Sequence, residues 1–289
     1  MQNEKRFAAF ILSHGRPDNI VTLKSLEKAN YTGDIYIVID DEDEQADRYF
    51  ELYGDKVLQF DKREAAKVTD TGDNNDDRRA VVYARNVSQQ MAKDLGYKYI
   101  LQLDDDYSSF YYRTPKDGKL KTVRVKSFDK VVDAMIELLD VTGATTIAFS
   151  QGGDFLGGIN RNYLQGMTRK AMNSFFLRTD KPIEFMGKIN EDVNAYVVHG
   201  GRGDLYFTVA KVQLTQMQTQ KNAGGLTDIY LDAGTYVKSF YTVMMAPSCT
   251  TIRPMGITDR RLHHSIKWDN AVPKIISDKY RKPRADINE

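Results

Sequence analysis

The stretch "YKYILQLDDDYSSFYY", residues 97 to 112, runs from an apolar, strand-like segment directly into three consecutive aspartates and a group of tyrosines. Carboxylates held this close repel one another, and each is costly to remove from water. The arrangement is stable only where a cation or several hydrogen-bond donors offset the charge.

The first 110 residues repeat a short apolar run, a polar loop and a segment with helical periodicity. Near-continuous apolar strands indicate a mostly parallel sheet covered on both faces, in which ligands bind at the carboxyl ends of the strands. The acids at 40–44 and 104–106 would then lie on the binding edge. We predict strands at 7–14, 34–44, 56–62 and 97–106, a helix beginning at Pro17 and Asp18, and a helix at 78–96 that ends at Gly96.

The second half of the chain is less regular. We see no linker-like change in composition, no repeat and no low-complexity segment, so the sequence favours a single α/β domain. We predict a basic hairpin or loop at 116–130, a helix at 131–143, a strand beginning at 144, a strand pair at 172–185, a helix beginning at 190 and a long strand at 204–220.

Composition restricts the class of protein. The 289 residues include 41% hydrophobic residues, enough for a full core, and a net charge of +1 gives no overall field toward nucleic acid or membrane. The single cysteine, Cys249, excludes an intramolecular disulfide and a cysteine-based zinc site and fits a reducing cytoplasm. The apolar run near the amino terminus is too short for a signal or membrane segment, so we expect a cytoplasmic protein without a membrane partner.

The strand-end acids are hard oxygen ligands, suited to Mg²⁺ or Mn²⁺ when a diphosphate supplies further oxygens. On a continuing strand, Asp104 and Asp106 would point the same way and Asp105 to the other face. A solvated acidic turn is the alternative. It does not explain why the triplet follows a strand at the binding edge.

Several motifs in this order resemble the GT-A glycosyltransferases, whose fold is Rossmann-like. "LDDDY" resembles their strand-terminating DxD motif, and Ala84, Arg85 and Asn86 resemble their "ARN" helix. More narrowly, "SHGRPDN", "ARNVSQQ" and "LQLDDDYSSF" are similar to the TET-associated glycosyltransferases of bacteriophages. That resemblance implies transfer of a sugar from a UDP-sugar to a modified DNA base such as 5-hydroxymethylcytosine.

The resemblance also implies a division of labour within the domain. Residues 1–112 would form the half that binds the nucleotide sugar, and 113–289 the half that binds the acceptor. Asp40 or Asp41 would accept a hydrogen bond from the uracil or ribose, and Arg85 would clamp the donor sugar or phosphate, unless it is an ordinary surface arginine. The remaining implied contacts are Ser13, His14 and Arg16 on the nucleotide, Asp104 on the ribose, sugar and metal, and Asp106 on the metal.

Two later segments complete the implied site. His263 or His264 would add a metal ligand and Lys267 would meet the diphosphate, although the proline expected before Trp268 is missing. In "INEDVNAY" the resemblance makes Asp192 the general base for an inverting transfer; a capping acid at a helix start is the alternative reading.

Acceptor recognition has the fewest signals. A basic run follows the tyrosines of the opening stretch and would contact phosphates and stack on bases, or simply form a solvated face. Its residues are Lys116, Lys119, Lys121, Arg124 and Lys126. The alternatives to a DNA acceptor are a glycan or protein acceptor, a degenerate binding module, or a nucleotidyltransferase.

Overall fold

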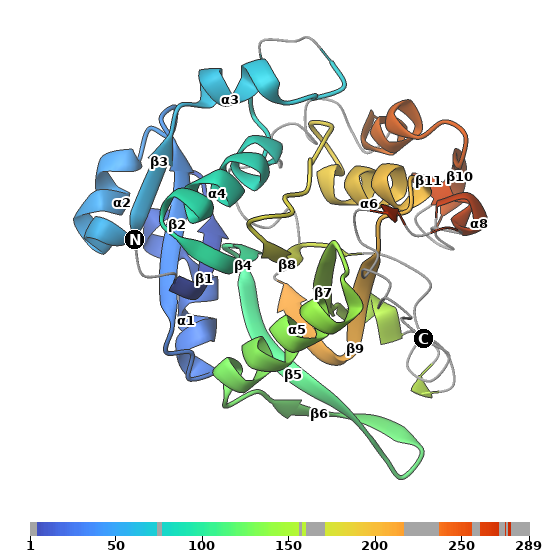
Figure 1. The fold of residues 1–289 in the computed structure, drawn as a ribbon, viewed down its shortest axis with the longest axis horizontal. Coiled ribbons are helices and arrows are strands. Elements are labelled where there is room, and N and C mark those ends of the chain that lie inside the picture. The colour runs from blue at the N-terminus through green and yellow to red at the C-terminus, as the bar shows by residue number, and fades with distance from the viewer. Residues whose placement is uncertain are drawn as a thin grey trace, which may run out of the picture.

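A nine-stranded sheet runs through the centre of the protein in the computed structural model (Figure 1). The structure describes residues 5–73, 77–155, 158–159, 171–216, 237–255, 261–271, 275 and 277–278. The strands lie in the order β3-β2-β1-β4-β8-β7-β9-β5-β6. Their bounds are β1 Lys5–Leu12, β2 Asp34–Asp40, β3 Val57–Phe60, β4 Tyr97–Asp104, β5 Tyr107–Lys116, β6 Lys119–Arg124, β7 Thr146–Ser150, β8 Ser174–Arg178 and β9 Tyr206–Gln216.

The sheet is mostly parallel. β1 pairs in parallel with β2 and with β4, β2 with β3, and β7 with β9. β8 and β5 run against the direction of the other strands. The predicted α/β fold with a mostly parallel sheet in one domain is confirmed. The boundary between 112 and 113 falls inside β5, so the two predicted halves share this sheet.

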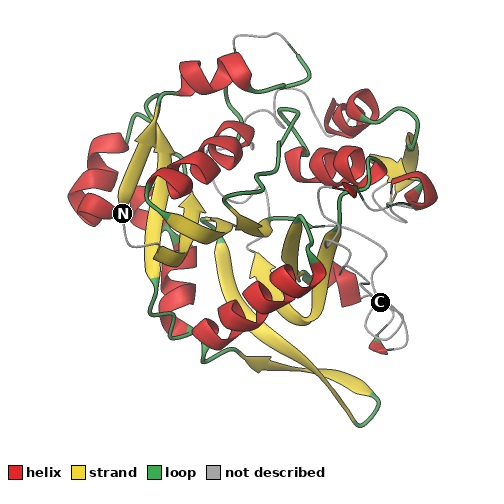
Figure 2. Cartoon of the chain, viewed as in Figure 1, coloured by secondary structure: helices red, strands yellow, loops and turns green. Residues whose placement is uncertain are grey.

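Helices cover both faces of the sheet (Figure 2). Along β1, Ala9 and Ile11 enter the core beneath α1, α2 and α5, whereas Ala8 and Phe10 enter the core beneath α3 and α4. Because successive side chains enter opposite cores, β1 is apolar at every position from Phe7 to Leu12. The helices are η1 Pro17–Asn19, α1 Val21–Lys28, α2 Ala46–Tyr53, η2 Gly54–Lys56, α3 Lys62–Val68, α4 Val82–Asp94, α5 Phe128–Thr142, η3 Gly152–Phe155, α6 Glu191–Gly201, a helix over 237–245 and α8 Trp268–Ala271.

A smaller unit beside the sheet contains α6, α8 and a second, two-stranded sheet. β10 (Thr250–Met255) and β11 (Arg261–Ile266) pair antiparallel. Their short core includes Val193 and Val197 of α6 together with Cys249, and Tyr196 stacks on Trp268 with 5.7 Å between ring centroids. No helix within the described ranges combines the length and apolar character needed to cross a bilayer.

The strand pair predicted at 172–185 is wrong. Only β8 is a strand there, and residues 183–185 bond instead to side chains of α4. A pattern of apolar residues cannot separate a strand from an extended segment whose partners are amide side chains. No sequence pattern predicted α2, α3, β10, β11 or the helix over 237–245, which are short or follow polar loops.

Of the two readings for 116–130, a basic hairpin or a loop, the structure has a hairpin, but it begins earlier, at Tyr107, and ends at Arg124, before α5 begins at Phe128. β5 and β6 pair antiparallel from Tyr111 opposite Arg124 to Lys116 opposite Lys119. Asp117 and Gly118 form the connection, with φ of 52° and 70°. Two successive positive φ angles are typical of the two-residue turns that match strand twist.

The aromatic core gives a stability prediction. Phe149 of β7 is 1% exposed and meets the rings of Phe110, Phe128 and Phe176 at 5.2 to 5.9 Å between centroids. Phe149→Ala should lower the free energy of unfolding by about 3 to 5 kcal/mol, because the cavity cannot collapse between packed layers. Urea denaturation measures this loss.

Val141→Ala is the matched control, since Val141 is 60% exposed on α5. We expect it to stay within about 0.5 kcal/mol of wild type. Equal effects of the two substitutions would contradict the placement of Phe149.

Candidate active site

The carboxyl end of β4 lies beside the carboxyl end of β1, where Leu12 pairs with Asp104. Asp105 joins the two strand ends: it accepts a hydrogen bond from Ser13 Oγ at 2.6 Å and pairs with Arg16 Nη2 at 3.0 Å. It is almost fully buried, and that burial raises its pKa to about 6 despite Arg16. Asp105 therefore fastens the loop after β1, and it shares no side-chain partner with Asp104 or Asp106 in the described contacts.

Asp104 is held by two other groups. Its Oδ1 pairs with Arg85 Nη2 at 2.5 Å, and its Oδ2 accepts a hydrogen bond from the Tyr107 hydroxyl at 3.0 Å. The Tyr107 hydroxyl also contacts the Asn173 carbonyl oxygen. Tyr107 is fully buried, so this tyrosine of the opening stretch belongs to the core and orients Asp104.

Asp106 is the aspartate with spare coordinating capacity. Its Oδ2 accepts a hydrogen bond from Gln216 Nε2 at 3.2 Å, whereas its buried Oδ1 has no hydrogen-bond partner among the described residues. Burial, with the charge of Asp104, raises the pKa of Asp106 to about 7. A buried carboxylate oxygen without a donor suits a divalent cation, because the cation would offset both the cost of burial and the repulsion from Asp104.

A cation at Asp106 would need further oxygen ligands from a bound substrate. Within the described ranges, no group of three or more His, Cys, Asp and Glu side chains is arranged to hold a metal. Mg²⁺ is commonly held by one or two carboxylates together with substrate phosphates. The residues present therefore fit a cation shared with a bound diphosphate.

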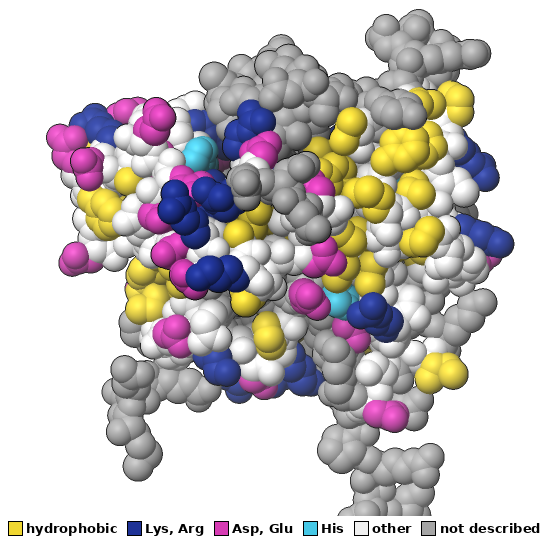
Figure 3. Space-filling view, turned by 90° about the horizontal axis from the view of Figure 1, so that it is seen from above, with side chains coloured by type: hydrophobic (Ala, Val, Ile, Leu, Met, Phe, Trp, Pro, Cys, Tyr) yellow, Lys and Arg dark blue, Asp and Glu magenta, His cyan; other side chains and the backbone are white. Residues whose placement is uncertain are grey.

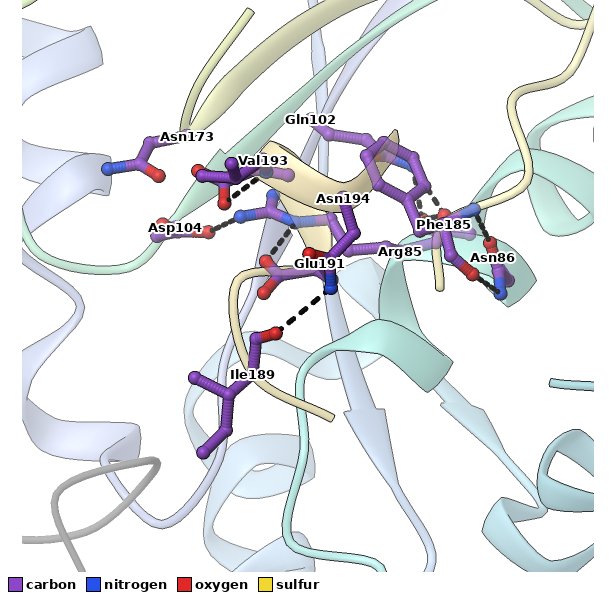
Figure 4. Close-up of polar contacts among 12 residues, drawn as sticks. Arg85, Asn86, Gln102, Asp104, Asn173, Phe185, Ile189, Glu191, Val193 and Asn194 are labelled. Atoms are coloured by element: carbon purple, nitrogen blue, oxygen red, sulfur yellow. Dashed lines mark hydrogen bonds and ion pairs between the residues drawn. The ribbon is translucent and has the colours of Figure 1, made fainter. Parts of the chain in front are cut away.

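Arg85 of α4 is the buried cation of the site (Figure 4). Its guanidinium is 1% exposed and lies between Asp104 and Glu191, whose Oε1 is 3.4 Å from Nε. It also lies 5.1 Å from the centre of the Phe175 ring. Burial alone lowers the pKa of Arg85, but the two carboxylates raise it above its ordinary value. The alternative of a surface arginine is wrong, because α4 turns this side chain into the molecule.

The first turn of α6 carries two buried acids. Glu191 and Asp192 are 5% and 7% exposed, and Asp192 Oδ1 accepts a hydrogen bond from the Val193 backbone at 2.7 Å. Burial, then the charge of Asp192, raises the pKa of Glu191 to about 7. Burial also raises the pKa of Asp192, although the Val193 amide opposes it. A carboxylate with a raised pKa is a stronger base near neutral pH.

Amide side chains of α4 fix the segment that leads into α6 (Figure 4). Asn86 donates to the Phe185 carbonyl at 3.0 Å and accepts from its amide at 2.8 Å. Gln89 does the same with the amide and carbonyl of Ile183, both at 2.8 Å. The sequence analysis gave neither residue a role. The sequence feature that could have identified Asn86 and Gln89 is their spacing of three, which puts both side chains on one face of the helix.

The loop after β1 and the end of β2 form a second polar group. Both oxygens of Asp40 are engaged, Oδ2 with His14 Nδ1 at 2.9 Å and Oδ1 with Lys62 Nζ at 3.1 Å. The hydrogen bond to Asp40 raises the pKa of His14. Burial alone raises the pKa of Asp40, but His14 and Lys62 lower it below its usual value. Asp41 accepts a hydrogen bond from the Lys62 backbone. The half-exposed His14 ring and the exposed Asp41 therefore reach the surface, whereas Asp40 and Lys62 are buried.

The structure treats the two late histidines differently. His264 Nδ1 lies 3.4 Å from Nδ2 of Asn190, the residue that precedes α6, so β11 brings His264 to the acids of α6. The His263 ring lies against the His264 ring, with 4.3 Å between the two centroids. Lys267 is exposed just after β11, and its backbone amide donates to the Cys249 carbonyl.

The surface seen from above has two regions (Figure 3). Acidic and basic side chains intermingle on one side, with a histidine among them, and apolar side chains gather on the other.

Residues 7–225 match the family model described as TET-Associated Glycosyltransferase. No curated protein matches the chain.

Solved structures of similar proteins include two bacterial enzymes. Glucosyl-3-phosphoglycerate synthase from Mycobacterium tuberculosis, in complex with Mg²⁺ and UDP, is 9% identical with a TM-score of 0.49, over 91% of this chain and 88% of that one. S. aureus TarS is 15% identical with a TM-score of 0.42, over 75% of this chain and 37% of that one.

The buried cation gives a prediction. Arg85→Met should lower the free energy of unfolding by about 3 to 5 kcal/mol, because the buried Glu191 and the partly buried Asp104 would lose their shared partner. Chemical denaturation at pH 7.5 measures this loss.

Arg48→Met is the matched control, because Arg48 also bridges two carboxylates, Asp18 and Glu51, but on the surface. We expect this variant to unfold at nearly the wild-type denaturant concentration. If Arg85→Met were equally mild, the carboxylates would not depend on the guanidinium.

Proposed function

Because the chain belongs to the TET-associated glycosyltransferase family, we propose that it transfers a sugar from a UDP-sugar to 5-hydroxymethylcytosine, or a similar hydroxymethylated pyrimidine, in phage DNA, with inversion at the anomeric carbon. Membership makes the chain a glycosyltransferase. The donor, acceptor and stereochemistry are the proposal. The observation that carries it is the ion cluster in which Arg85 joins strand-end Asp104 to Glu191 of α6.

The donor lies along the carboxyl ends of β1, β2 and β4 in this proposal. Ser13, His14 and Arg16 line that edge. Both carboxylate oxygens of Asp40 are already bonded, to His14 and Lys62, so we assign the contact with the nucleoside to the His14 ring. Asp40 then acts by holding the ring. Lys267 is placed on the diphosphate, as the resemblance implies.

Mn²⁺ or Mg²⁺ is the cofactor we propose, with Asp106 as the first protein ligand. When bound, the cation neutralises charge that develops on the departing diphosphate. Asp104 contributes its remaining lone pairs toward the ribose, sugar or metal while Arg85 and Tyr107 hold it in place. His264 is favoured over His263 as a further ligand because it reaches Asn190 at the start of α6.

Asp192 is the general base in this proposal. Its carboxylate takes the proton of the acceptor hydroxymethyl group while the oxygen forms a bond to the anomeric carbon and the bond to the diphosphate breaks. The raised pKa of Asp192 suits this transfer. Glu191 pairs with Arg85, so we assign it a positioning role and not proton transfer.

The test uses labelled UDP-sugars with Mn²⁺ and three acceptors: a duplex containing 5-hydroxymethylcytosine, the same duplex with plain cytosine, and an oligosaccharide mixture. We expect label only on the modified duplex. Label on the oligosaccharides alone would replace DNA with a glycan acceptor. No transfer and no UDP-sugar hydrolysis would favour a binding module.

The assignment of the base gives a prediction. Asp192→Asn should lower kcat by about 10²- to 10⁴-fold with little change in KM for the donor, because proton removal is lost and binding is not. Asp94→Asn, at an exposed position at the end of α4, is the control and should match wild type. Wild-type turnover by the Asp192 variant would remove it from the mechanism.

The pKa of Asp106 gives a prediction about metal. Its folded-state pKa of about 7 lies above the ordinary value of 3.8, so the metal-free protein loses stability from this group as pH rises through 7. A cation binds the ionised carboxylate, so Mn²⁺ should raise the Tm more at pH 8 than at pH 5.5. A thermal-shift series with Mn²⁺ and with EDTA measures this.

Asp106→Asn should abolish the Mn²⁺ dependence of the Tm at both pH values, because the amide cannot offer a charged ligand. The site would be elsewhere if this variant kept the full Mn²⁺ effect.

A further inference from the structure

The β5–β6 hairpin extends beyond the body of the protein (Figures 1 and 2). β6 is the last strand of the sheet, and the outer part of the hairpin is exposed on both strands. Apart from Tyr107 at the start of β5, whose hydroxyl donates to Asp104, no hairpin residue is among the described side-chain contacts of the three aspartates. Its sequence must therefore be explained by something other than the chemistry of transfer.

The outer hairpin is strongly basic. Between 113 and 126 there are six basic residues and one acid, Asp117, in a chain whose net charge is only +1. The acid lies in the turn, where Lys121 Nζ is 3.9 Å from its Oδ2. The hairpin is therefore a locally positive projection in a chain that is almost neutral.

The strand register sorts the basic residues by face. Lys116 lies opposite Lys119, and Lys121 lies opposite Thr114, so the three lysines share one face of the ribbon. All three are exposed. The arginines belong to the opposite face, where Arg124 lies over the Tyr111 ring at 6.0 Å and Arg113 Nε bonds to Gln213. The lysine face is thus a row of ammonium groups that the molecule does not use to pack itself.

We propose that this lysine face is a DNA-binding arm that contacts backbone phosphates of the duplex flanking the acceptor base. A two-stranded ribbon fits a DNA groove, and lysines neutralise phosphates without reading sequence. This inference rests on the proposed function for its DNA acceptor. Edge lysines also discourage pairing of β6 with a second copy of the chain, so self-association is an outcome that the test must separate.

The length of β5 determines how far along a DNA duplex the arm reaches. β5 begins at Tyr107, next to Asp106, and its ten residues span about 30 Å. That distance equals about nine base pairs of duplex. The arm therefore acts on KM for long DNA and leaves the chemical step unchanged.

The experiment compares the wild type with Lys116→Gln/Lys119→Gln/Lys121→Gln. Binding to a plain 24-base-pair duplex is measured by fluorescence anisotropy at several salt concentrations. We expect at least about tenfold weaker binding and a salt slope smaller by about 3, one unit for each lost phosphate contact. The control variant is Lys56→Gln/Lys93→Gln/Lys98→Gln, at three exposed lysines outside the hairpin, which should bind like wild type.

Transfer assays separate the arm from the site. On a modified 24-base-pair duplex the arm variant should show a raised KM and an unchanged kcat, and on a six-nucleotide modified acceptor it should match wild type. The proposal would be overturned if the arm variant lost equal activity on both acceptors, or if it bound the plain duplex as tightly as the control variant does. A wild-type dimer that the arm substitutions dissociate would also overturn it.

The two proposals fail in different ways. If the wild type labels modified DNA and the arm variant has unchanged KM, the arm is wrong and the DNA acceptor stands. If the wild type labels only glycans but binds plain duplex through these lysines, the DNA acceptor is wrong and the arm stands as a nucleic-acid contact.

Discussion

The buried ion cluster centred on Arg85 is the constraint on which the rest of the site depends. A guanidinium removed from water is tolerated only if carboxylates and an aromatic face surround it. Asp104, Glu191 and Phe175 supply these from β4, α6 and β8. One cation therefore joins the binding edge of the sheet to the helix that carries Asp192.

The three adjacent aspartates show how a fold separates identical residues. Asp105 pairs with Arg16 and accepts a hydrogen bond from Ser13. Asp104 pairs with Arg85 and accepts a hydrogen bond from Tyr107. Asp106 keeps one oxygen without a donor among the residues that the structure describes. The repulsion implied by "DDD" is thus relieved unequally, and Asp106 is the carboxylate that is least compensated.

Positioning of the α6 acids relies on neutral amides as well as charges. Asn86 and Gln89 each bond to both backbone groups of one residue in 183–185, so α4 holds the approach to α6 as a strand would. Such contacts join residues about a hundred positions apart. Sequence patterns register spacing along one element, which is why these amides were not recognised and 172–185 was predicted as paired strands.

The sequence by itself determined the mostly parallel α/β sheet, the edge at which acids gather, and the basic hairpin, because these follow from local periodicity and from turn residues such as Asp117 and Gly118. The tertiary structure decided which acid does what. Burial of Arg85, occupation of Asp40 by His14 and Lys62, and the approach of His264 to Asn190 each depend on chain segments that meet only when folded. Electrostatic roles are set by neighbours in space, and the order of residues along a chain does not specify them.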